Sequence, residues 1–333
     1  MKILMFGRGV ISLLYGWALE QAGNTVDFYV RPGRSDQYGP TIKLEIIDAR
    51  RSVLGQRVDE SWAIRMREEL PADHDYDLIF LSVQHYHLNE ATEFLSQRIG
   101  NATVLIFNNC WVEPRDATSG LPSTQLAWGF PGAGGGLGSD GVLRGALLRK
   151  VTLGTFRTDP NVRELAVREL FKKSGFAIDE QRDFRSFLFV HFALDCGVEI
   201  EALRAGSIAR AFASSRQRRN AILNMRELVP LLAARSVDLK DQSGKLGPIL
   251  RLPAWFVGWL MGLAPKMILP VRVLLDSHSN MEEYRATCRD VLSEARNLGV
   301  NLPRLEAASP LFTKEVVGEA VQKSQHFPAA FRA

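Results

Sequence analysis

The first 34 residues constrain the fold of this chain more than any other segment. An apolar run over residues 2–6 is followed by Gly7, Gly9 and the small residue Ser12, which have the spacing of a G-x-G-x-x-G turn. An amphipathic helix and a second strand over 25–30 come next. This order of strand, glycine turn, helix and strand is the opening of a dinucleotide-binding unit.

Each residue of the turn has its own physical role. Gly7 allows the sharp turn, and Gly9 lets the backbone approach a pyrophosphate, whose charge lies at the N-terminus of the helix beginning near Val10. Ser12 stands where a third glycine usually allows close helix–strand packing, and its side chain is small enough to be tolerated. A glycine turn that binds nothing is the alternative. The strand before the turn and the helix after it favour the nucleotide site.

The end of the second strand indicates which nucleotide is bound. Proteins specific for NAD usually carry Asp or Glu there to hold the ribose hydroxyls, whereas an arginine accommodates a 2′-phosphate. This chain has Arg31 and Arg34, while Asp27 falls in the middle of the strand, where its side chain should not reach the ribose. We therefore expect NADP(H) as the cofactor. The alternative is that both arginines are solvated loop charges.

Length and composition limit the remaining classes of protein. A chain of 333 residues with 46% hydrophobic and 23% charged residues is long enough for two globular domains. The net charge of +4 is small, so no nucleic-acid partner is expected, and the cluster Arg216, Arg218 and Arg219 is interpreted as a helix face. Three scattered cysteines indicate neither a disulfide framework nor a metal site. Met1 leads directly into a core strand, so we expect a cytoplasmic protein without a signal peptide.

The most apolar segment spans residues 252–264. Its 13 residues are too few for a membrane span, which needs roughly 20. We expect a buried or interface helix, compatible with a homodimer, and contact with a membrane surface is the alternative.

Strands and helices alternate through the N-terminal part of the chain. The predicted segments are a small excursion of strands within 38–58, strands over 77–83, 103–107 and 151–155, and helices over 88–98 and 160–174. This pattern predicts a Rossmann-type α/β domain with a doubly wound parallel sheet, whose ligands bind at the carboxyl ends of the strands. The glycine-dense stretch 128–141 has two interpretations. It is a flexible turn between strands or a second phosphate cradle, and the turn is favoured at least as much as the cradle.

Beyond Gly175 the strand signals stop and helical patterns follow. We therefore place a domain boundary near residue 180, with an NADP-binding domain over 1–179 and an all-α substrate and dimerisation domain over 180–333. The expected helices are 183–205, 214–235, 246–263, 280–298 and 306–323.

Five motifs occur in a fixed order along most of the chain: MKILMFGRGVISLLYG, DLIFLSVQHY, TVLIFNNCW, FRSFLFVHFALDCGVEIEALRAGS and MEEYRATCRDVLSEARNLGVNLP. Their order and spacing resemble the ketopantoate reductase (2-dehydropantoate 2-reductase) family, which pairs an NADP-binding domain with an all-helical C-terminal domain. The resemblance implies a hydride-transferring oxidoreductase whose small carbonyl or hydroxy substrate binds between the domains.

The resemblance also assigns roles to strand-end residues. The family's Val-Lys becomes Val83-Gln84, which implies cofactor contacts without the lysine, and the family's Gln-Asn-Gly retains its asparagine as Asn109. Glu283 matches a substrate-binding glutamate, the alternative being a surface charge. Ser277 or Ser279 is a loose match to a substrate-contacting serine.

The family's lysine, asparagine and asparagine at intervals of four become Phe187, His191 and Asp195. Phenylalanine supplies neither positive charge nor a proton, so ketopantoate itself is not the expected substrate. We expect His191 to act as the acid/base, oriented by Asp195 on the same helix face. The alternative is a core histidine, and His85 and His87 at a strand end compete for the role.

Three further interpretations complete the sequence-based account. A protein that lost catalysis with its lysines and only senses NADPH or binds a partner fits the same residues. An enzyme like 6-phosphogluconate or hydroxyacid dehydrogenases would require a lysine on the helix over 183–205, which contains none. Cys110 would lie near the nicotinamide but has no evident base partner, so we interpret it as structural.

Overall fold

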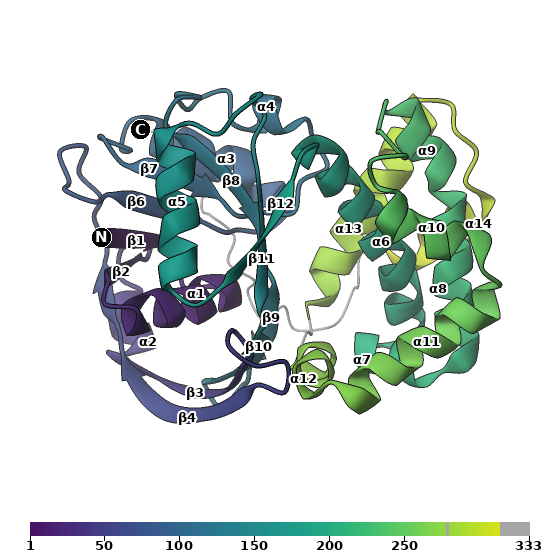
Figure 1. Cartoon of the computed structure of the whole chain (residues 1–333), viewed down its shortest axis with the longest axis horizontal. Helices are drawn as coiled ribbons and strands as arrows, with labels where there is room; N and C mark the ends of the chain where they lie inside the picture. Colours follow the sequence, from purple (N-terminus) through teal and green to yellow (C-terminus); the bar gives the residue numbers. More distant parts are fainter. Residues whose placement is uncertain (278–279, 314–333) are drawn as a thin grey trace.

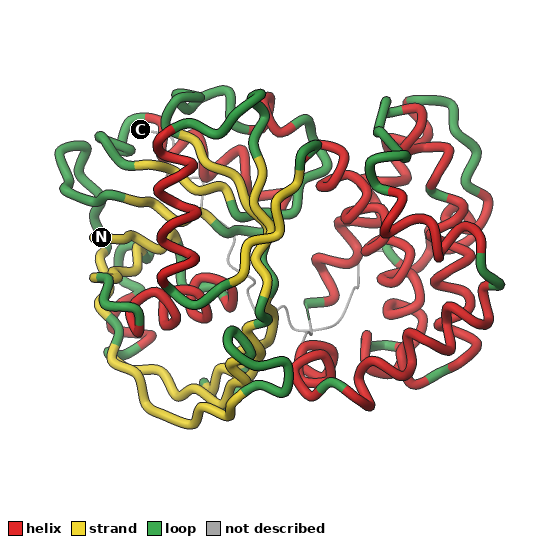
Figure 2. The backbone as a smooth tube through the Cα atoms, in the orientation of Figure 1, coloured by secondary structure: helices red, strands yellow, loops and turns green. Residues whose placement is uncertain are grey.

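The computed structural model describes residues 1–277 and 280–313 and divides into a part with strands and a helical part (Figures 1 and 2). The mixed part lies at the left of Figure 1, and the helices from α6 (Phe184–Ala205) onward lie at the right. Ser279 and the portion of the expected helix 306–323 beyond residue 313 lie outside the described residues.

The larger sheet has eight strands in the order β12-β11-β8-β7-β6-β1-β2-β5. Neighbouring strands from β5 to β8 pair in parallel, whereas β11 runs antiparallel to β8. Strands β6 and β7 are buried throughout, as expected of apolar central strands. The eight strands are β1 (Lys2–Phe6), β2 (Thr25–Tyr29), β5 (Arg65–Arg67), β6 (Leu78–Leu81), β7 (Thr103–Ile106), β8 (Leu126–Phe130), β11 (Lys150–Gly154) and β12 (Ala177–Gln181).

Helices cover both faces of this sheet, as a doubly wound fold requires. Alternate residues of β1 enter different cores: Ile3 packs with residues of α1 and α5, and Leu4 packs with residues of α3 and α4. The helices of this part are α1 (Val10–Gln21), α2 (Ser35–Tyr38), α3 (Leu88–Ser96), α4 (Pro114–Ala117) and α5 (Val162–Lys173), with a 3₁₀ turn, η1 (His85–His87).

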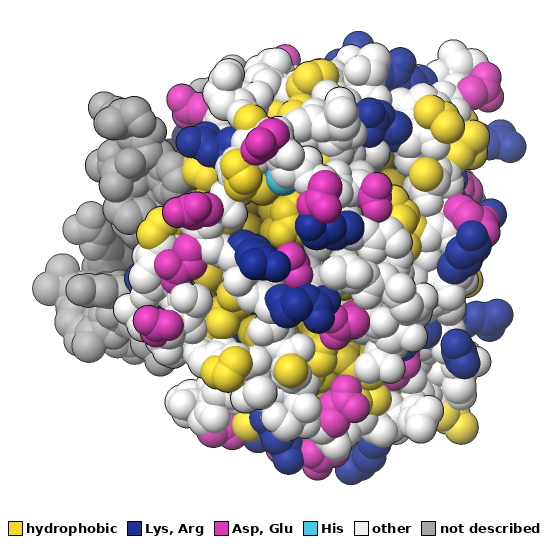
Figure 3. All heavy atoms as spheres, turned by 90° about the vertical axis from the view of Figure 1, so that its left-hand side faces the viewer, with side chains coloured by type: hydrophobic (Ala, Val, Ile, Leu, Met, Phe, Trp, Pro, Cys, Tyr) yellow, Lys and Arg dark blue, Asp and Glu magenta, His cyan; other side chains and the backbone are white. Residues whose placement is uncertain are grey.

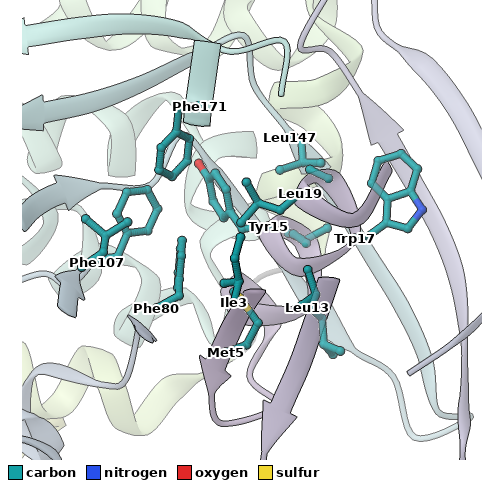
Figure 4. Packing of buried hydrophobic residues seen from close by; sticks show 14 of the residues in the cluster. Ile3, Met5, Leu13, Tyr15, Trp17, Leu19, Phe80, Phe107, Leu147 and Phe171 are labelled. Atoms are coloured by element: carbon teal, nitrogen blue, oxygen red, sulfur yellow. The ribbon is translucent and has the colours of Figure 1, made fainter. Parts of the chain in front are cut away.

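Tyr15 lies at the centre of the core under α1. Its ring centroid is 4.9 Å from that of Phe107 and 5.9 Å from that of Phe171, and Figure 4 shows these rings and Phe80 gathered around it. The Tyr15 hydroxyl accepts a hydrogen bond from the N–H of Gly132 at 2.9 Å, and burial raises its pKa. The buried hydroxyl therefore has a partner, as buried polar groups require.

A second sheet of four strands has the order β4-β3-β10-β9. The expected excursion within 38–58 is confirmed by β3, which pairs antiparallel with β4. Its four strands are β3 (Thr41–Asp48), β4 (Gln56–Ala63), β9 (Ala133–Leu137) and β10 (Val142–Leu147).

Two sequence-based interpretations of this region were wrong. The glycine-dense stretch 128–141 is neither a flexible turn nor a phosphate cradle, because it contains β9, where a Cβ on Gly135 would lie 2.3 Å from the backbone oxygen of Arg144. The strands also do not stop at Gly175, since β12 follows. Its half-exposed edge position explains why it lacks an apolar pattern.

The helical part begins where Asp183 caps α6, its side chain accepting from the N–H of Ser186 at 2.9 Å, and α6 ends at Gly206 in the left-handed conformation. Prolines break two of the expected helices: 214–235 is α8 and α9, and 246–263 is α10 and α11. The remaining helices are α7 (Ile208–Ala213), α8 (Ser215–Glu227), α9 (Val229–Ala234), α10 (Ser243–Arg251), α11 (Ala254–Met267), α12 (Leu269–Ser277), α13 (Met281–Asn297) and α14 (Pro303–Ala308), with a 3₁₀ turn, η2 (Ser309–Leu311).

Helix α12 joins the two parts of the molecule. A Cβ on Gly134 of β9 would lie 2.4 Å from Leu274, and one on Gly136 would lie 2.2 Å from the backbone oxygen of Ser277. Glycines in β9 therefore allow a helix of the C-terminal part to approach the smaller sheet closely. Among the described helices, none alone is long and apolar enough to cross a membrane, and α11 and α12 meet those criteria only as a pair bent by 101°.

Candidate functional site

The glycine turn lies at the carboxyl end of β1. Gly7 has a φ of +96°, and its N–H donates to the backbone oxygen of Tyr29 at 3.0 Å. Gly9 precedes the first turn of α1, which no side chain caps. A Cβ on either glycine would meet no atom within 4 Å, so the surface before the helix N-terminus is open. Uncapped amides beside open space fit a bound pyrophosphate.

Close packing of α1 on the sheet occurs one turn later than the fingerprint suggests. Ser12 is fully buried. A Cβ on Gly16, however, would lie 2.7 Å from the ring of Phe28 and 3.4 Å from Met5. Gly16 therefore provides the close helix–strand approach that we had assigned to Ser12. The sequence did not reveal this, because the contact can be located only in three dimensions.

The two candidate phosphate-binding arginines lie in a fixed turn after β2. The N–H of Arg34 donates to the backbone oxygen of Arg31 at 3.1 Å. Glu68, which follows β5, accepts from the N–H of Gly33 at 2.9 Å and that of Ser35 at 2.8 Å. These hydrogen bonds and that of the Ser35 hydroxyl lower the pKa of Glu68 to about 2, so its carboxylate holds the turn. The hydrogen bond from the N–H of Gly7 to Tyr29 of β2 holds the glycine loop next to this turn.

Arg8, between the two glycines, was missed by the sequence-based reasoning. Its guanidinium lies 4.8 Å from the ring centroid of Tyr38 on α2, and burial lowers its pKa. Its Nε is buried and has no hydrogen-bond partner among the described residues. A buried donor of this kind fits an anionic ligand on the turn. An arginine inside the glycine motif was the only available signal in the sequence.

Asp27 lies in the middle of β2, as expected, and is not available to a ribose. Its side chain is 2% exposed. It accepts from Arg65 Nε at 3.0 Å, Arg67 Nε at 3.2 Å and the Tyr76 hydroxyl at 2.9 Å, and these partners lower its pKa. Asp27 lies at about the sequence distance expected of an acid that selects NAD. Its carboxylate instead holds β5 against β2.

The ends of β6 and β7 are tied together by Asn108. Its Oδ1 accepts from the N–H of Val83 at 3.3 Å, and its Nδ2 donates to the backbone oxygen of the same residue. Gln84 follows at the start of η1. Asn108 thus fixes the position of Val83 and Gln84, a structural role that the motif alone did not reveal.

Asn109, Asp195 and His191 form a connected series. Asn109 Nδ2 donates to Asp195 Oδ2 at 3.0 Å, and His191 Nε2 lies 3.3 Å from the same oxygen. The series joins the carboxyl end of β7 to α6, so candidate residues from two distant segments meet. The Oδ1 of Asn109 is buried without a hydrogen-bond partner among the described residues. A substrate or cofactor group could satisfy it.

His191 is not a core histidine, because its side chain is 33% exposed. Aromatic rings surround it on one side: its ring centroid is 4.2 Å from that of Phe130 and 5.9 Å from that of Phe187. Phe187 is itself 2% exposed. The imidazole therefore has an apolar wall on this side.

A buried acid, Glu199, continues this face of α6 one turn beyond Asp195. Burial, followed by the nearby negative charges of Asp195 and Glu283, raises the pKa of Glu199 well above its usual value. Its Oε2 has no hydrogen-bond partner among the described residues. The sequence-based reasoning missed Glu199, because the sequence shows its spacing along α6 but not its neighbours on α13.

Glu283 lies in the first turn of α13, with a structural role beside its candidate one. Asn280 accepts from its N–H and donates to its Oε2, both at 3.3 Å. Burial, followed by the charges of Glu199 and Glu283, raises the pKa of the Tyr284 hydroxyl. Glu283 lies close enough to Glu199 of α6 to contribute to its raised pKa, whereas the adjacent Glu282 is exposed and binds Arg289 at 2.6 Å.

The competing histidines have other partners. His85 Nε2 lies 2.9 Å from Asp290 Oδ2 of α13, with a side chain only 6% exposed and a ring packed against Phe192. His87 Nδ1 lies 3.5 Å from Glu90. His85 therefore joins the two parts of the molecule, and its burial between helices favours a structural role.

Two other candidate residues, Cys110 and Ser277, have structural partners. Cys110 is buried, its Sγ donates to Val112 O at 3.1 Å, and burial raises the pKa of its thiol to about 12. The Ser277 hydroxyl donates to Val273 O at 2.6 Å, and Ser279 lies outside the described residues. Within 1–277 and 280–313, no three or more His, Cys, Asp or Glu side chains are grouped to hold a metal ion.

Comparisons with known proteins agree with this architecture. Residues 3–158 match the model of the ketopantoate reductase PanE/ApbA family. No match was found among the curated proteins. A solved structure of 2-dehydropantoate 2-reductase from Geobacter metallireducens is 14% identical, with a TM-score of 0.68 over 94% of this chain and 99% of that one.

Two other solved structures have the same fold. D-mandelate dehydrogenase with NADH and anilino(oxo)acetate is 15% identical, with a TM-score of 0.68 over 94% of this chain and 97% of that one. The dimeric ketopantoate reductase from Staphylococcus aureus is 10% identical, with a TM-score of 0.61 over 94% and 99%. The expected fold class, an α/β parallel-sheet domain followed by a helical region, is confirmed. Over residues 3–158, this chain is therefore similar to the ketopantoate reductase PanE/ApbA family.

Proposed function

We propose that this protein is an NADP-dependent oxidoreductase that acts by hydride transfer on a small carbonyl or hydroxy compound bound between its two parts. The observation that carries this proposal is the connected series of Asn109, Asp195 and His191. His191 and Asp195, which we propose as the acid/base pair, lie beside the carboxyl end of β7, at the edge where α/β proteins bind their ligands. The open glycine turn supports the cofactor assignment.

The proton chemistry belongs to the side chains of this chain. The nicotinamide, when bound, supplies or receives the hydride. In the reducing direction, protonated His191 gives its proton to the oxygen of the substrate carbonyl as the carbon receives the hydride. Asp195 orients the ring, and Asn109 holds Asp195.

The charge of the site restricts the substrate. Asp195, Glu199 and Glu283 lie near one another on α6 and α13, and α6 contains no lysine. A carboxylate substrate would be repelled by Asp195 and Glu283, and it would meet Phe187 where the family resemblance expects a cation. We infer a neutral carbonyl or hydroxy compound, rather than ketopantoate, as the substrate.

Calorimetry and a substrate panel test the function directly. We expect NADPH to bind to the purified protein and to be oxidised in the presence of at least one member of a panel of small neutral aldehydes and ketones. Binding without oxidation across the panel would favour the alternative, a catalytically silent NADPH sensor. If neither NADP(H) nor NAD(H) produced a heat of binding, both functions would be rejected.

A further inference from the structure

The outer face of α11 and the end of α10 carry a cluster of exposed apolar side chains, which we name the α11 face. Trp255 is 63% exposed, Trp259 is 51% exposed and Met267 is 74% exposed. In Figure 1, α11 lies along the lower edge of the helical part, away from the larger sheet. The other exposed apolar residues of the α11 face are Leu250, Leu252 and Leu260.

The packing of α11 explains why its large side chains point outward. Its glycines face α8: a Cβ on Gly258 would lie 3.0 Å from the backbone nitrogen of Arg219, and one on Gly262 would lie 2.6 Å from the guanidinium of Arg218. Arg218 Nε also donates to the backbone oxygen of Gly258 at 2.7 Å. Because α11 uses its small residues for packing, the tryptophans, which are four residues apart, remain on a free face.

Cations outnumber acids on the helices that form the α11 face or contact α11, where the acids include Glu227 at the end of α8 and Asp276 near the end of α12. Neither residues 207–226 nor residues 246–275 contain Asp or Glu. By contrast, both signs of charge are interspersed on the face of the N-terminal part shown in Figure 3. The exposed cations on the helices that form or flank the α11 face are Arg210, Arg216, Arg219, Arg251, Lys266 and Arg272.

We propose that the α11 face docks on the surface of a membrane that contains anionic lipids, with α11 lying in the plane of the interface. Tryptophan prefers the headgroup level of a bilayer, and surrounding cations are attracted to anionic lipids. The 14 residues of α11 are too few to span the hydrocarbon, which needs roughly 20. A second copy is a poorer occupant, because a twofold interface would bring the same cations together. This inference is independent of the proposed reaction.

Vesicle sedimentation of the full chain tests the proposal. We expect the protein to sediment with phosphatidylcholine vesicles containing phosphatidylglycerol and to remain in the supernatant with phosphatidylcholine alone. Binding should weaken as salt is raised from about 0.05 M to about 0.5 M, because surface charge interactions are screened. Tryptophan fluorescence should be quenched by brominated lipid, which reports contact with the acyl chains.

A double variant, Trp255→Ser with Trp259→Ser, should lose most of the sedimentation and quenching, by at least about 10-fold in apparent affinity. Its matched control is Val162→Ser with Leu165→Ser, which removes two apolar side chains from the exposed face of α5, 79% and 51% exposed. The control should bind vesicles as the unmodified chain does. Thermal unfolding of all three proteins verifies that the variants are folded.

Three outcomes would overturn the proposal. The first is no sedimentation with anionic vesicles at low salt. The second is sedimentation unchanged by the double tryptophan variant. The third is a dimer in solution that dissociates in the tryptophan variant, since a second copy would then cover the α11 face.

Discussion

Four side chains spaced by one helical turn occupy one face of α6, and their chemistry changes along the helix. Phe187 is buried among aromatic rings, His191 is partly exposed, Asp195 accepts from Asn109, and Glu199 is buried. The cation that the family resemblance would place at the first position is absent. The proton donor is therefore expected one turn later, where the imidazole has both a carboxylate partner and access to solvent.

Replacement of His191 tests this assignment at the level of one residue. His191→Ala should lower kcat/KM for the best carbonyl substrate by about 10²–10⁴-fold, the usual contribution of a general acid. NADPH affinity, measured by calorimetry, should be unchanged, because the glycine turn is untouched. An unchanged kcat/KM would show that His191 is not the acid.

Glu199 gives a prediction about stability. Its pKa is raised in the folded protein by burial and by neighbouring negative charge. Above the usual value of 4.5, the folded state therefore holds a proton that the unfolded state has lost, so this group makes the free energy of unfolding fall as pH rises. Glu199→Gln removes this decrease in the free energy of unfolding. The difference in free energy of unfolding between the variant and the unmodified chain should therefore increase with pH, by at most about 1.4 kcal/mol per pH unit.

Urea unfolding of Glu199→Gln from about pH 5 to about pH 8 measures the trend. Glu169→Gln, on the exposed side of α5, is the control and should show no comparable trend. A constant difference between Glu199→Gln and the unmodified chain would contradict the inference that this acid is held neutral.

At the scale of elements, the loops that shape the cofactor site are held by contacts made elsewhere. Glu68 follows β5 but anchors the turn after β2, and Asn108 follows β7 but fixes the loop after β6. Such anchoring keeps a binding loop in one conformation before its ligand arrives, which reduces the entropy lost on binding.

The β2–α2 turn should determine preference for the phosphorylated cofactor. In the variant Arg31→Ala with Arg34→Ala, NADPH affinity should fall by about 10–100-fold, the effect of removing one or two charge-assisted hydrogen bonds, while NADH affinity changes little. Calorimetry with both nucleotides measures the two affinities. Arg57→Ala, an exposed arginine on β4, is the control. Equal losses for NADH and NADPH would contradict a specific role in binding the 2′-phosphate.

The packing of α1 on β2 should depend on Gly16 rather than on Ser12. Gly16→Val should lower the free energy of unfolding by about 1–3 kcal/mol, because the new side chain collides with the buried ring of Phe28. Ser12→Ala keeps the packing and removes a buried hydroxyl that has no partner among the described residues, so it should be nearly neutral. Urea unfolding distinguishes the two. A larger loss for Ser12→Ala would reverse this assignment.

At the scale of the whole molecule, contacts between distant segments join the two parts. His85, on η1 of the N-terminal part, binds Asp290 of α13, and Arg185 of α6 donates through Nε to Glu113 at 2.8 Å. Helix α12 packs on the glycines of β9. The site between β7 and α6 therefore depends on how these contacts hold the parts together.

Removal of the His85 contact tests this dependence. His85→Ala should destabilise the protein by about 1–3 kcal/mol, because it empties a buried position and leaves Asp290 without this partner. His87→Ala, on the same turn, should change stability by less than about 0.5 kcal/mol. Thermal and urea unfolding measure both. Loss of activity in His85→Ala without any loss of stability would instead support the competing catalytic role.

The sequence by itself determined the elements with strong local patterns. The apolar strands 77–83 and 103–107, the glycine turn and the helix 183–205 were predicted because burial on both faces, positive φ and helical periodicity each leave a mark within a few residues. The helical spacing alone likewise places Phe187, His191 and Asp195 on one face of α6.

Only the tertiary structure decided the features that depend on neighbours distant in the chain. Strand β12 has no apolar pattern because it lies at an edge, and the glycines of β9 are explained only by α12 and β10 packing against them. Arg8 against Tyr38, Gly16 against Phe28, and Glu199 against α13 are likewise pairings of segments far apart in the chain. Periodicity in the sequence shows which side of a helix or strand is buried. It does not show which residues from distant segments lie against that side, and those residues complete a site.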